Sequence, residues 1–207
     1  MNDQVSGPRA ARGAAARDRV VRSALQAYAT NGYAGSSLAG IATAAGLTNA
    51  GLLHHFPSKE ELLVAVLQER DRVDGERFHL RGLVGLEALD ALVHLVEANT
   101  STPELVRAFT VLMGESAAED HPASQWFRER YPRRCDNLAA ALHAGMDRGE
   151  IRPDTDCDAV AVEIIAMMDG LQVQWVLDPE RVDMARIFTH YIGTVRRAVQ
   201  VPVDQSP

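Results

Sequence analysis

The sequence contains too few cysteines for a disulfide framework or a cysteine-based metal centre. Its 207 residues include only Cys135 and Cys157, whose spacing matches no common pattern of metal ligands. We therefore predict no metal site and no cofactor. We interpret both cysteines as buried small apolar residues in a reducing cytoplasm, with a redox-sensing or metal-sensing role as the alternative.

Long hydrophobic runs are also missing. No stretch of eighteen apolar residues is free of charges, so we expect no membrane-spanning helix. The arginines near the N-terminus are not followed by an apolar segment, so this region does not resemble a secretory signal. These observations predict a cytoplasmic protein.

Aromatic residues are scarce, at 5% of the chain, whereas alanine is abundant. This composition favours closely packed helices over sheets. No segment alternates polar and apolar residues with a period of two, so no strand is predicted. The predicted fold class is therefore all-α, and the chain is long enough to bury a substantial core.

The motifs of common enzyme classes are absent as well. The sequence has no nucleophile elbow, no glycine-rich phosphate loop, no HExxH motif and no pair of carboxylates with a histidine three residues on. We therefore predict that the protein is not an enzyme. A helical enzyme or carrier remains the alternative from another functional class.

Acidic residues outnumber basic ones, which gives a formal net charge of −7, but the charge is unevenly distributed. Residues 1–59 contain six basic and two acidic side chains, a net charge of +4, which leaves −11 for residues 60–207. A basic head on an acidic body is typical of a protein that binds a polyanion at one end. An arginine-rich tail without function would account for Arg9 and Arg12, but not for the arginines within residues 17–22, which follow a helical pattern.

Apolar residues recur at helical spacing along the chain. Near the N-terminus, two short helices stand between two longer ones. Pro57 ends the second short helix because proline disfavours helix in the residue before it, and Ser58 caps the helix that follows. The predicted helices cover about residues 10–30, 37–45, 48–56, 59–78, 84–98, 103–118, 122–147, 156–177 and 183–200.

The segment LAGIATAAGLTNAGLLHHFPSKEE, residues 38–61, contains the two short helices. Helices of this length are not stable alone, so they need the long helices on either side as a scaffold. Gly46 allows a turn with positive φ between them, and Ala42 is small enough for them to cross closely. The pattern predicts a three-helix head that contains a helix-turn-helix. The residues expected to bury and fix the angle between the short helices are Ile41, Ala45, Leu47 and Leu52.

The start of the second short helix should point away from this scaffold. Its free backbone amides and partial positive charge suit a phosphate group. The Asn49 carboxamide matches the edge of an adenine, and the Ala50 methyl group can pack on a thymine methyl group. We therefore predict that Thr48, Asn49, Ala50 and Gly51 contact double-stranded DNA; the alternative is a solvated surface corner.

The segment SLAGIATAAGLTNAGLLHHFPSKEELLVAVL resembles the N-terminal signature of the tetracycline-repressor (TetR) family of bacterial regulators. The resemblance covers about residues 15–67 and includes the Ile-Ala pair, the Ala-Gly-Leu turn and the Ser-Lys-Glu helix start. It implies further DNA contacts from a second set of side chains, namely Ser36, Ser37, His54, His55 and Lys59.

Three positions depart from the family pattern. The family often has a basic residue where Asn49 stands, a hydroxyl residue where Gly51 stands and a tyrosine where Leu53 stands. Fewer side chains therefore remain to contact phosphate, and Lys59, the only lysine in the chain, gains importance.

The last two predicted helices indicate a homodimer. Helix 156–177 is apolar nearly all round, so more than one of its sides must be covered, and a second copy would cover the outer side. Gly170 within it suggests close approach of two helices. We predict a four-helix bundle across a two-fold axis, which the resemblance also implies; a core helix in a monomer is the alternative. The predicted interface residues are Val160, Ile164, Met167, Leu171, Trp175, Phe188, Ile192 and Val195.

The middle helices contain aromatic and soft apolar residues, which in the family enclose a pocket for a small-molecule effector. Such a pocket, with few polar groups, suits a hydrophobic molecule. The alternative is that these residues only form the core. The residues assigned to the pocket are Phe109, Met113, Trp126, Arg130, His143 and Met168.

Together these features predict a helix-turn-helix DNA-binding domain at residues 10–58 and a helical ligand-binding and dimerisation domain at residues 59–201. The predicted function is that of a transcriptional regulator, namely a repressor released from a palindromic operator by a small apolar effector. The alternative is a helix-turn-helix protein that binds DNA without a small-molecule response.

Overall fold

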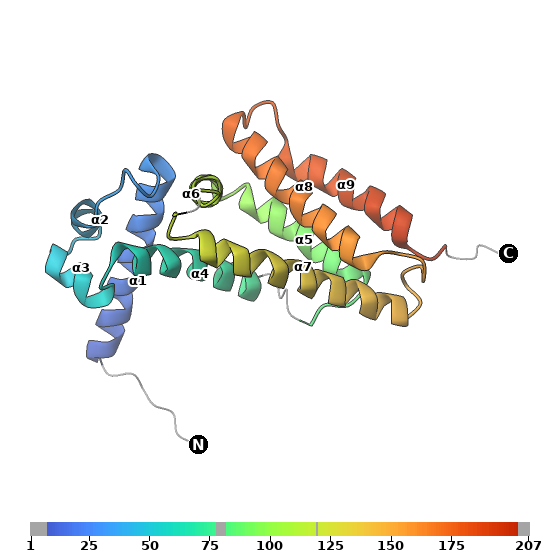
Figure 1. The fold of residues 1–207 in the computed structure, drawn as a ribbon, viewed down its shortest axis with the longest axis horizontal. Coiled ribbons are helices and arrows are strands. Elements are labelled where there is room, and N and C mark those ends of the chain that lie inside the picture. Colours follow the sequence, from blue (N-terminus) through green and yellow to red (C-terminus); the bar gives the residue numbers. More distant parts are fainter. Residues whose placement is uncertain (1–7, 78–81, 119, 203–207) are drawn as a thin grey trace, which may run out of the picture. The chain divides into compact units, whose positions relative to one another are not determined.

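The structure, a computed structural model, describes residues 8–77, 82–118 and 120–202. These residues form nine α-helices and no strand beyond one isolated bridge between Ile151 and Gln200 (Figure 1). The all-α prediction is therefore confirmed. The helices are α1 (Pro8–Asn31), α2 (Leu38–Ala44), α3 (Asn49–His55), α4 (Lys59–Arg77), α5 (Leu86–Asn99), α6 (Pro103–Glu115), α7 (Ser124–Asp147), α8 (Cys157–Leu177) and α9 (Met184–Val199).

The helix boundaries predicted from the sequence agree with these bounds to within a few residues. The predicted end of the fourth helix, at residue 78, lies outside the described residues. The last turn predicted for α6 is replaced by hydrogen-bonded turns after Glu115. Helix α7 continues through Pro132, although a proline inside a helix removes one backbone hydrogen-bond donor.

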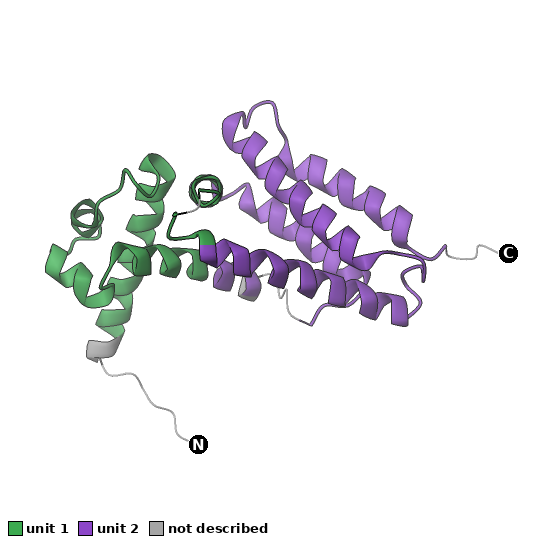
Figure 2. Ribbon diagram, viewed as in Figure 1, with its two compact units in different colours: residues 1–70, 107–124 green, residues 71–106, 125–207 purple. Residues whose placement is uncertain are grey.

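The chain divides into two compact units (Figure 2). The first comprises residues 1–70 and 107–124, and the second comprises residues 71–106 and 125–207. Most of α6 therefore groups with the N-terminal helices, although it lies far from them in the sequence. The functional division at residues 10–58 and 59–201 stays a prediction.

The core of the first unit contains the residues that fix α2 against α3. Ile41, Ala45 and Leu52 are buried as predicted, whereas Leu47 is half-buried. Gly46 has a φ of 70°, which a residue with a side chain rarely adopts, so the predicted turn is confirmed. The starts of α2, α3 and α4 are each capped by a side-chain oxygen, as expected for serine and threonine at these positions. The caps are Ser37 to Gly40 N at 3.1 Å, Thr48 to Gly51 N at 3.0 Å and Ser58 to Glu61 N at 3.0 Å.

The core of the second unit lies among α5, α7, α8 and α9. Cys157, at the start of α8, is buried in it, and Cys135 on α7 is half-buried against it. Burial raises the pKa of both thiols, and nearby carboxylates raise it further. Both cysteines therefore favour the protonated form, which fits their interpretation as apolar residues rather than reactive thiolates.

Helix α8 is long and apolar enough to cross a membrane by length and composition alone, because its most apolar stretch has a mean hydropathy of 1.4. The sequence predicts no membrane-spanning helix. Core helices of globular proteins meet the same criteria, so this property is weak evidence for insertion into a membrane. Only 39% of the most apolar stretch of α8 is buried in the structure. The exposed residues of the helix include Val162 and Leu177, which are 55% and 79% exposed.

Candidate nucleic-acid interface

Helix α3 begins with side chains that face solvent. Thr48, Asn49 and Ala50 are exposed, and Gly51 is half-buried. The Thr48 hydroxyl accepts a hydrogen bond from the Gly51 amide and so fixes the first turn. Leu53 lies one helical turn after Asn49, on the same face, and is 37% exposed. The exposed face therefore combines a carboxamide, a methyl group and an isobutyl group, all of which suit base edges in the major groove.

The two serines before α2 differ in their surroundings. Ser37 is exposed and caps α2. Ser36 is only 5% exposed, and its hydroxyl donates to the Gly32 carbonyl at 2.7 Å. The structure therefore turns the Ser36 hydroxyl into the protein, because it closes the turn after α1. Of the two predicted phosphate contacts, only Ser37 has an accessible side chain.

The end of α3 and the start of α4 carry the remaining predicted contacts. His54 is exposed and His55 is half-buried, with their ring centroids 5.5 Å apart. Lys59 is half-buried, and its ammonium group lies 4.3 Å from the centroid of the Tyr33 ring. The lysine is thus held at the surface by an aromatic face.

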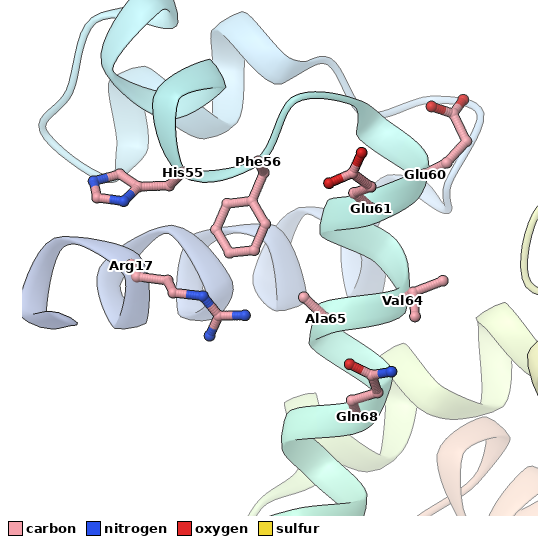
Figure 3. A pocket seen from close by; sticks show the side chains of 8 residues that line it. All are labelled: Arg17, His55, Phe56, Glu60, Glu61, Val64, Ala65 and Gln68. Carbon is pink, nitrogen blue, oxygen red and sulfur yellow. The ribbon is translucent and has the colours of Figure 1, made fainter. Parts of the chain in front are cut away.

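Two arginines of α1 contact the ends of the two short helices, α2 and α3. The Arg17 guanidinium lies 4.9 Å from the centroid of the buried Phe56 ring, and Figure 3 shows it below that ring. Arg19 donates to the Ala45 carbonyl at 3.3 Å, at the end of α2. Both side chains thus help to hold the head together. The Arg9 side chain lies outside the described residues.

A pocket of about 430 Å³ opens beside Phe56 (Figure 3). Apolar side chains from α4 and polar groups from three helices line it together. The lining residues are Arg17, His55, Phe56, Glu60, Glu61, Val64, Ala65 and Gln68. None of them was predicted to bind an effector.

The residues predicted for the effector pocket are divided between the two units. Phe109 and Met113 belong to the first unit, where the Arg70 guanidinium lies 3.8 Å from the centroid of the Phe109 ring. Trp126 and Arg130 belong to the second unit, and the Arg130 guanidinium lies 5.6 Å from the Trp126 ring. Their assignment to a pocket stays a prediction.

His143 lies apart from these residues. Its side chain is 51% exposed and its Nε2 atom lies 3.5 Å from Asp158 Oδ2. It follows Arg130 by thirteen residues on the same helix, a rise of about 20 Å. The structure therefore does not bring His143 together with Arg130. Met168 is buried in the core of the second unit.

Arg130 is part of an ion-pair cluster between α4 and α7. Its Nε donates to Asp71 Oδ1 at 3.0 Å, and Arg134 donates to the same oxygen at 2.8 Å. Burial opposes ionisation of Asp71, but the two guanidinium groups outweigh burial and lower the pKa of this carboxyl. The carboxylate is thus charged at neutral pH. Arg130, which was predicted to contact an effector, is therefore already paired with Asp71 of the protein itself.

The predicted dimer residues fall into two groups. Val160, Trp175 and Val195 are half-buried, and Met167 is exposed. The other four, Ile164, Leu171, Phe188 and Ile192, are buried inside their own unit and offer no outer surface. The outer face of α8 instead carries the apolar and small residues Val162, Ala166, Met167, Gly170 and Leu177.

Sequence reasoning missed several residues at these surfaces. Leu53 and Val162 were detectable by counting helical turns from Asn49 and from Gly170, respectively. Tyr33 and Glu115 had no sequence signal, because they are 82 positions apart and meet only in the fold, where the Tyr33 amide donates to Glu115 Oε2 at 2.9 Å.

Two family models match the chain. The model for bacterial regulatory proteins of the tetR family matches residues 20–66, which include α2 and α3. The model for the C-terminal region of BetI-type transcriptional repressors matches residues 87–197, more than half of the chain. A search of curated proteins found no significant match.

Solved structures share the whole fold. A TetR transcriptional regulator from Chloroflexus aurantiacus is 27% identical, with a TM-score of 0.79 over 93% of this chain and 100% of that chain. SmeT in complex with triclosan is 18% identical, with a TM-score of 0.81 over 93% and 95% of the two chains. A regulator from Saccharomonospora viridis in complex with choline is 23% identical, with a TM-score of 0.73 over 90% and 98%.

The two family models together account for both halves of the chain, and the N-terminal match coincides with the exposed α3 and its scaffold. The protein therefore belongs to the TetR family of DNA-binding transcriptional regulators.

Proposed function

We propose that the protein is a repressor that inserts α3 into the major groove of its operator. The observation that carries this proposal is the exposed start of α3 within a head that matches the family model. Asn49 and Ala50 contact base edges there, and Leu53 adds an apolar contact to a thymine methyl group. The second set of contacts, to the phosphate backbone, comes from Ser37, Thr48, Gly51, His54, His55 and Lys59.

The operator-binding form is a homodimer. The outer face of α8 supports this, because Val162, Met167 and Leu177 are exposed large apolar side chains on one helix. A second copy would cover them and place two α3 helices in successive major grooves of a palindromic site. The residues around Gly170 form the centre of the interface.

A small effector releases the repressor from DNA. Two proteins of the same fold have been solved in complex with choline and with triclosan, which supports a small-molecule effector. The aromatic residues of α7, among them Trp126 and Phe127, are buried and pack edge-on, and they would line the site for such a molecule. Effector binding favours a form whose two heads no longer fit adjacent grooves, so occupancy of the operator falls.

A gel-shift titration tests the proposal. The purified protein is titrated against the DNA upstream of its own gene, with a shuffled duplex of the same composition as the control, and then with a panel of apolar small molecules. A sequence-specific shift that one compound reverses supports a ligand-responsive repressor.

Each of the other outcomes contradicts one part of the proposed function. A shift of equal affinity on both duplexes would contradict an operator-specific repressor. A specific shift that no compound in a broad panel reverses would favour a DNA-binding protein without a small-molecule response. Absence of any shift would contradict binding to this upstream DNA.

A further inference from the structure

Tyr33 joins the ends of three helices within the first unit. It follows Gly32, directly after α1. Its ring lies 4.3 Å from the Lys59 ammonium group, and its hydroxyl donates to Glu60 Oε1 at 2.9 Å, so it contacts the first two residues of α4. Its backbone amide donates to Glu115 Oε2 at 2.9 Å, at the end of α6.

The position of Tyr33 is fixed from several directions. Gly32 has a φ of 69°, and a side chain at this position would collide with the Glu115 carboxylate. The His121 ring meets the Tyr33 ring edge-on with centroids 5.2 Å apart, and the Tyr28 ring lies 5.9 Å away. Because its backbone and ring are both held, Tyr33 can hold other side chains in turn.

Tyr33 contacts two opposite charges that are neighbours in the sequence. An ammonium group is attracted to the face of an aromatic ring, whereas a carboxylate accepts a strong hydrogen bond from a phenol. Burial and the Glu60 carboxylate both raise the pKa of Tyr33, so its hydroxyl stays protonated and donates. The Glu60 carboxylate is thus bound at the ring's hydroxyl, while the Lys59 ammonium group lies on the face.

We propose that Tyr33 is a positioning residue for DNA binding, which holds Lys59 in the conformation that contacts a DNA phosphate. This inference rests on the proposed contact between Lys59 and the DNA backbone. A lysine side chain loses much rotamer freedom when it is fixed, and a side chain ordered before binding loses less. Lys59 is the only lysine in the chain, so no other lysine can replace it.

A double-mutant cycle on operator affinity tests this inference. The four proteins are the natural chain, Tyr33→Leu, Lys59→Ala and the double variant, with Tyr33→Phe as the conservative control. We expect Tyr33→Leu to weaken binding about two- to fivefold for each subunit, because it removes the ring face. Tyr33→Phe keeps that face and should retain affinity to within about twofold. In the Lys59→Ala background, Tyr33→Leu should cause no further loss.

The outcomes separate the inference from the proposed function. An equal loss from Tyr33→Leu in both backgrounds would mean that Tyr33 only supports folding, and would overturn the inference alone. A Tyr33→Phe protein as weak as Tyr33→Leu would contradict the role of the ring face. If Lys59→Ala left both affinity and its salt dependence unchanged, the phosphate contact itself would be wrong. Should Tyr33→Leu not fold, Tyr33→Met, with an adaptable apolar side chain, takes its place in the cycle.

Discussion

Asn49 and Lys59 have different chemical roles in the proposed complex with DNA. A carboxamide pairs with the edge of one particular base, whereas an ammonium group contacts phosphates, which are the same at every base pair. Asn49 is exposed at the start of α3, and Lys59 lies at the start of α4. Substitution of Asn49 should therefore change the base preference, whereas substitution of Lys59 should change the affinity for every DNA sequence.

We expect Asn49→Ala to lower discrimination at one operator position by about 1–3 kcal/mol, because a bidentate base contact is lost. Lys59→Ala should weaken all operator variants alike and reduce the slope of log affinity against log salt by about 0.9 for each lysine. Affinities for a set of single-base operator variants at several salt concentrations measure both effects. If the two variants changed the affinities across the operator variants and the salt slope in the same way, the roles assigned to Asn49 and Lys59 would be contradicted.

His121 is a half-buried histidine whose pKa makes the stability of the folded protein depend on pH. Its side chain is 11% exposed, its Nδ1 accepts from the Ala123 amide at 3.2 Å, and its Nε2 lies 3.7 Å from Glu115 Oε2. Burial lowers the pKa of His121, and the Glu115 carboxylate only partly opposes this. The folded protein therefore holds the ring neutral at a pH where the unfolded chain already binds a proton.

The free energy of unfolding should consequently fall as pH drops below about 6.5, the ordinary pKa of histidine, until pH passes the lower pKa of the folded state. His121→Gln removes this contribution, so its stability should fall less over the same interval. Urea unfolding of both proteins at a series of pH values measures the difference. Parallel pH curves would show that His121 does not have the lowered pKa.

At the scale of whole elements, α4 belongs to both compact units. Its first part packs in the head, with Leu62 and Leu63 fully buried, and its later part carries Asp71 of the ion-pair cluster with α7. The Arg130 side chain in that cluster is only 6% exposed. Loss of one partner from a buried ion pair leaves charge that is poorly compensated, which costs more than the pair contributes.

Asp71→Asn should therefore lower the free energy of unfolding by about 3 kcal/mol. Chemical denaturation measures this, with Asp154→Ala as the control. Asp154 binds Arg152 at 2.8 Å, but both side chains are about half exposed or more, so this pair lies in solvent and its removal should leave stability unchanged. Similar losses from the two variants would contradict the importance of burial at Asp71.

At the scale of the whole molecule, the outer face of α8 decides whether the protein acts as one copy or two. Gly170 is exposed near the middle of this face, and a methyl group added there would have no neighbour within 4 Å in the same chain. A glycine within an exposed helix costs up to about 1 kcal/mol relative to alanine. Close approach of a second α8 would give a reason for it.

The effect of Gly170→Ala therefore distinguishes a monomer from a dimer. In a monomer the change should raise the free energy of unfolding by up to about 1 kcal/mol and do nothing else. In the proposed dimer it should weaken association and, with it, operator binding. Sedimentation equilibrium and operator titration measure the two effects.

Gly114→Ala is the matched control, because Gly114 also lies in a helix, is exposed and has open space around it. It should stabilise the chain without changing association. Val162→Asp, which places a charge on the same face of α8, should produce monomers. A Val162→Asp protein that remained dimeric would contradict the proposed interface.

Local patterns in the sequence determined the helices, the head and the family resemblance. Gly46 predicts its own turn because few other residues adopt a positive φ, and Thr48 and Ser58 predict helix starts because their hydroxyls satisfy free amides. These signals act between residues a few positions apart, so they can be interpreted without knowledge of the fold.

The tertiary structure alone decided which surfaces are free and which distant residues meet. Periodicity marks Phe188 and Val162 equally as apolar, but only packing shows that the first is fully buried in its own unit and that the second is 55% exposed. The contact between Tyr33 and Glu115 likewise joins residues 82 positions apart. The helical periodicity of apolar residues indicates on which face of a helix a side chain lies. Which element covers that face depends on the packing of the whole chain.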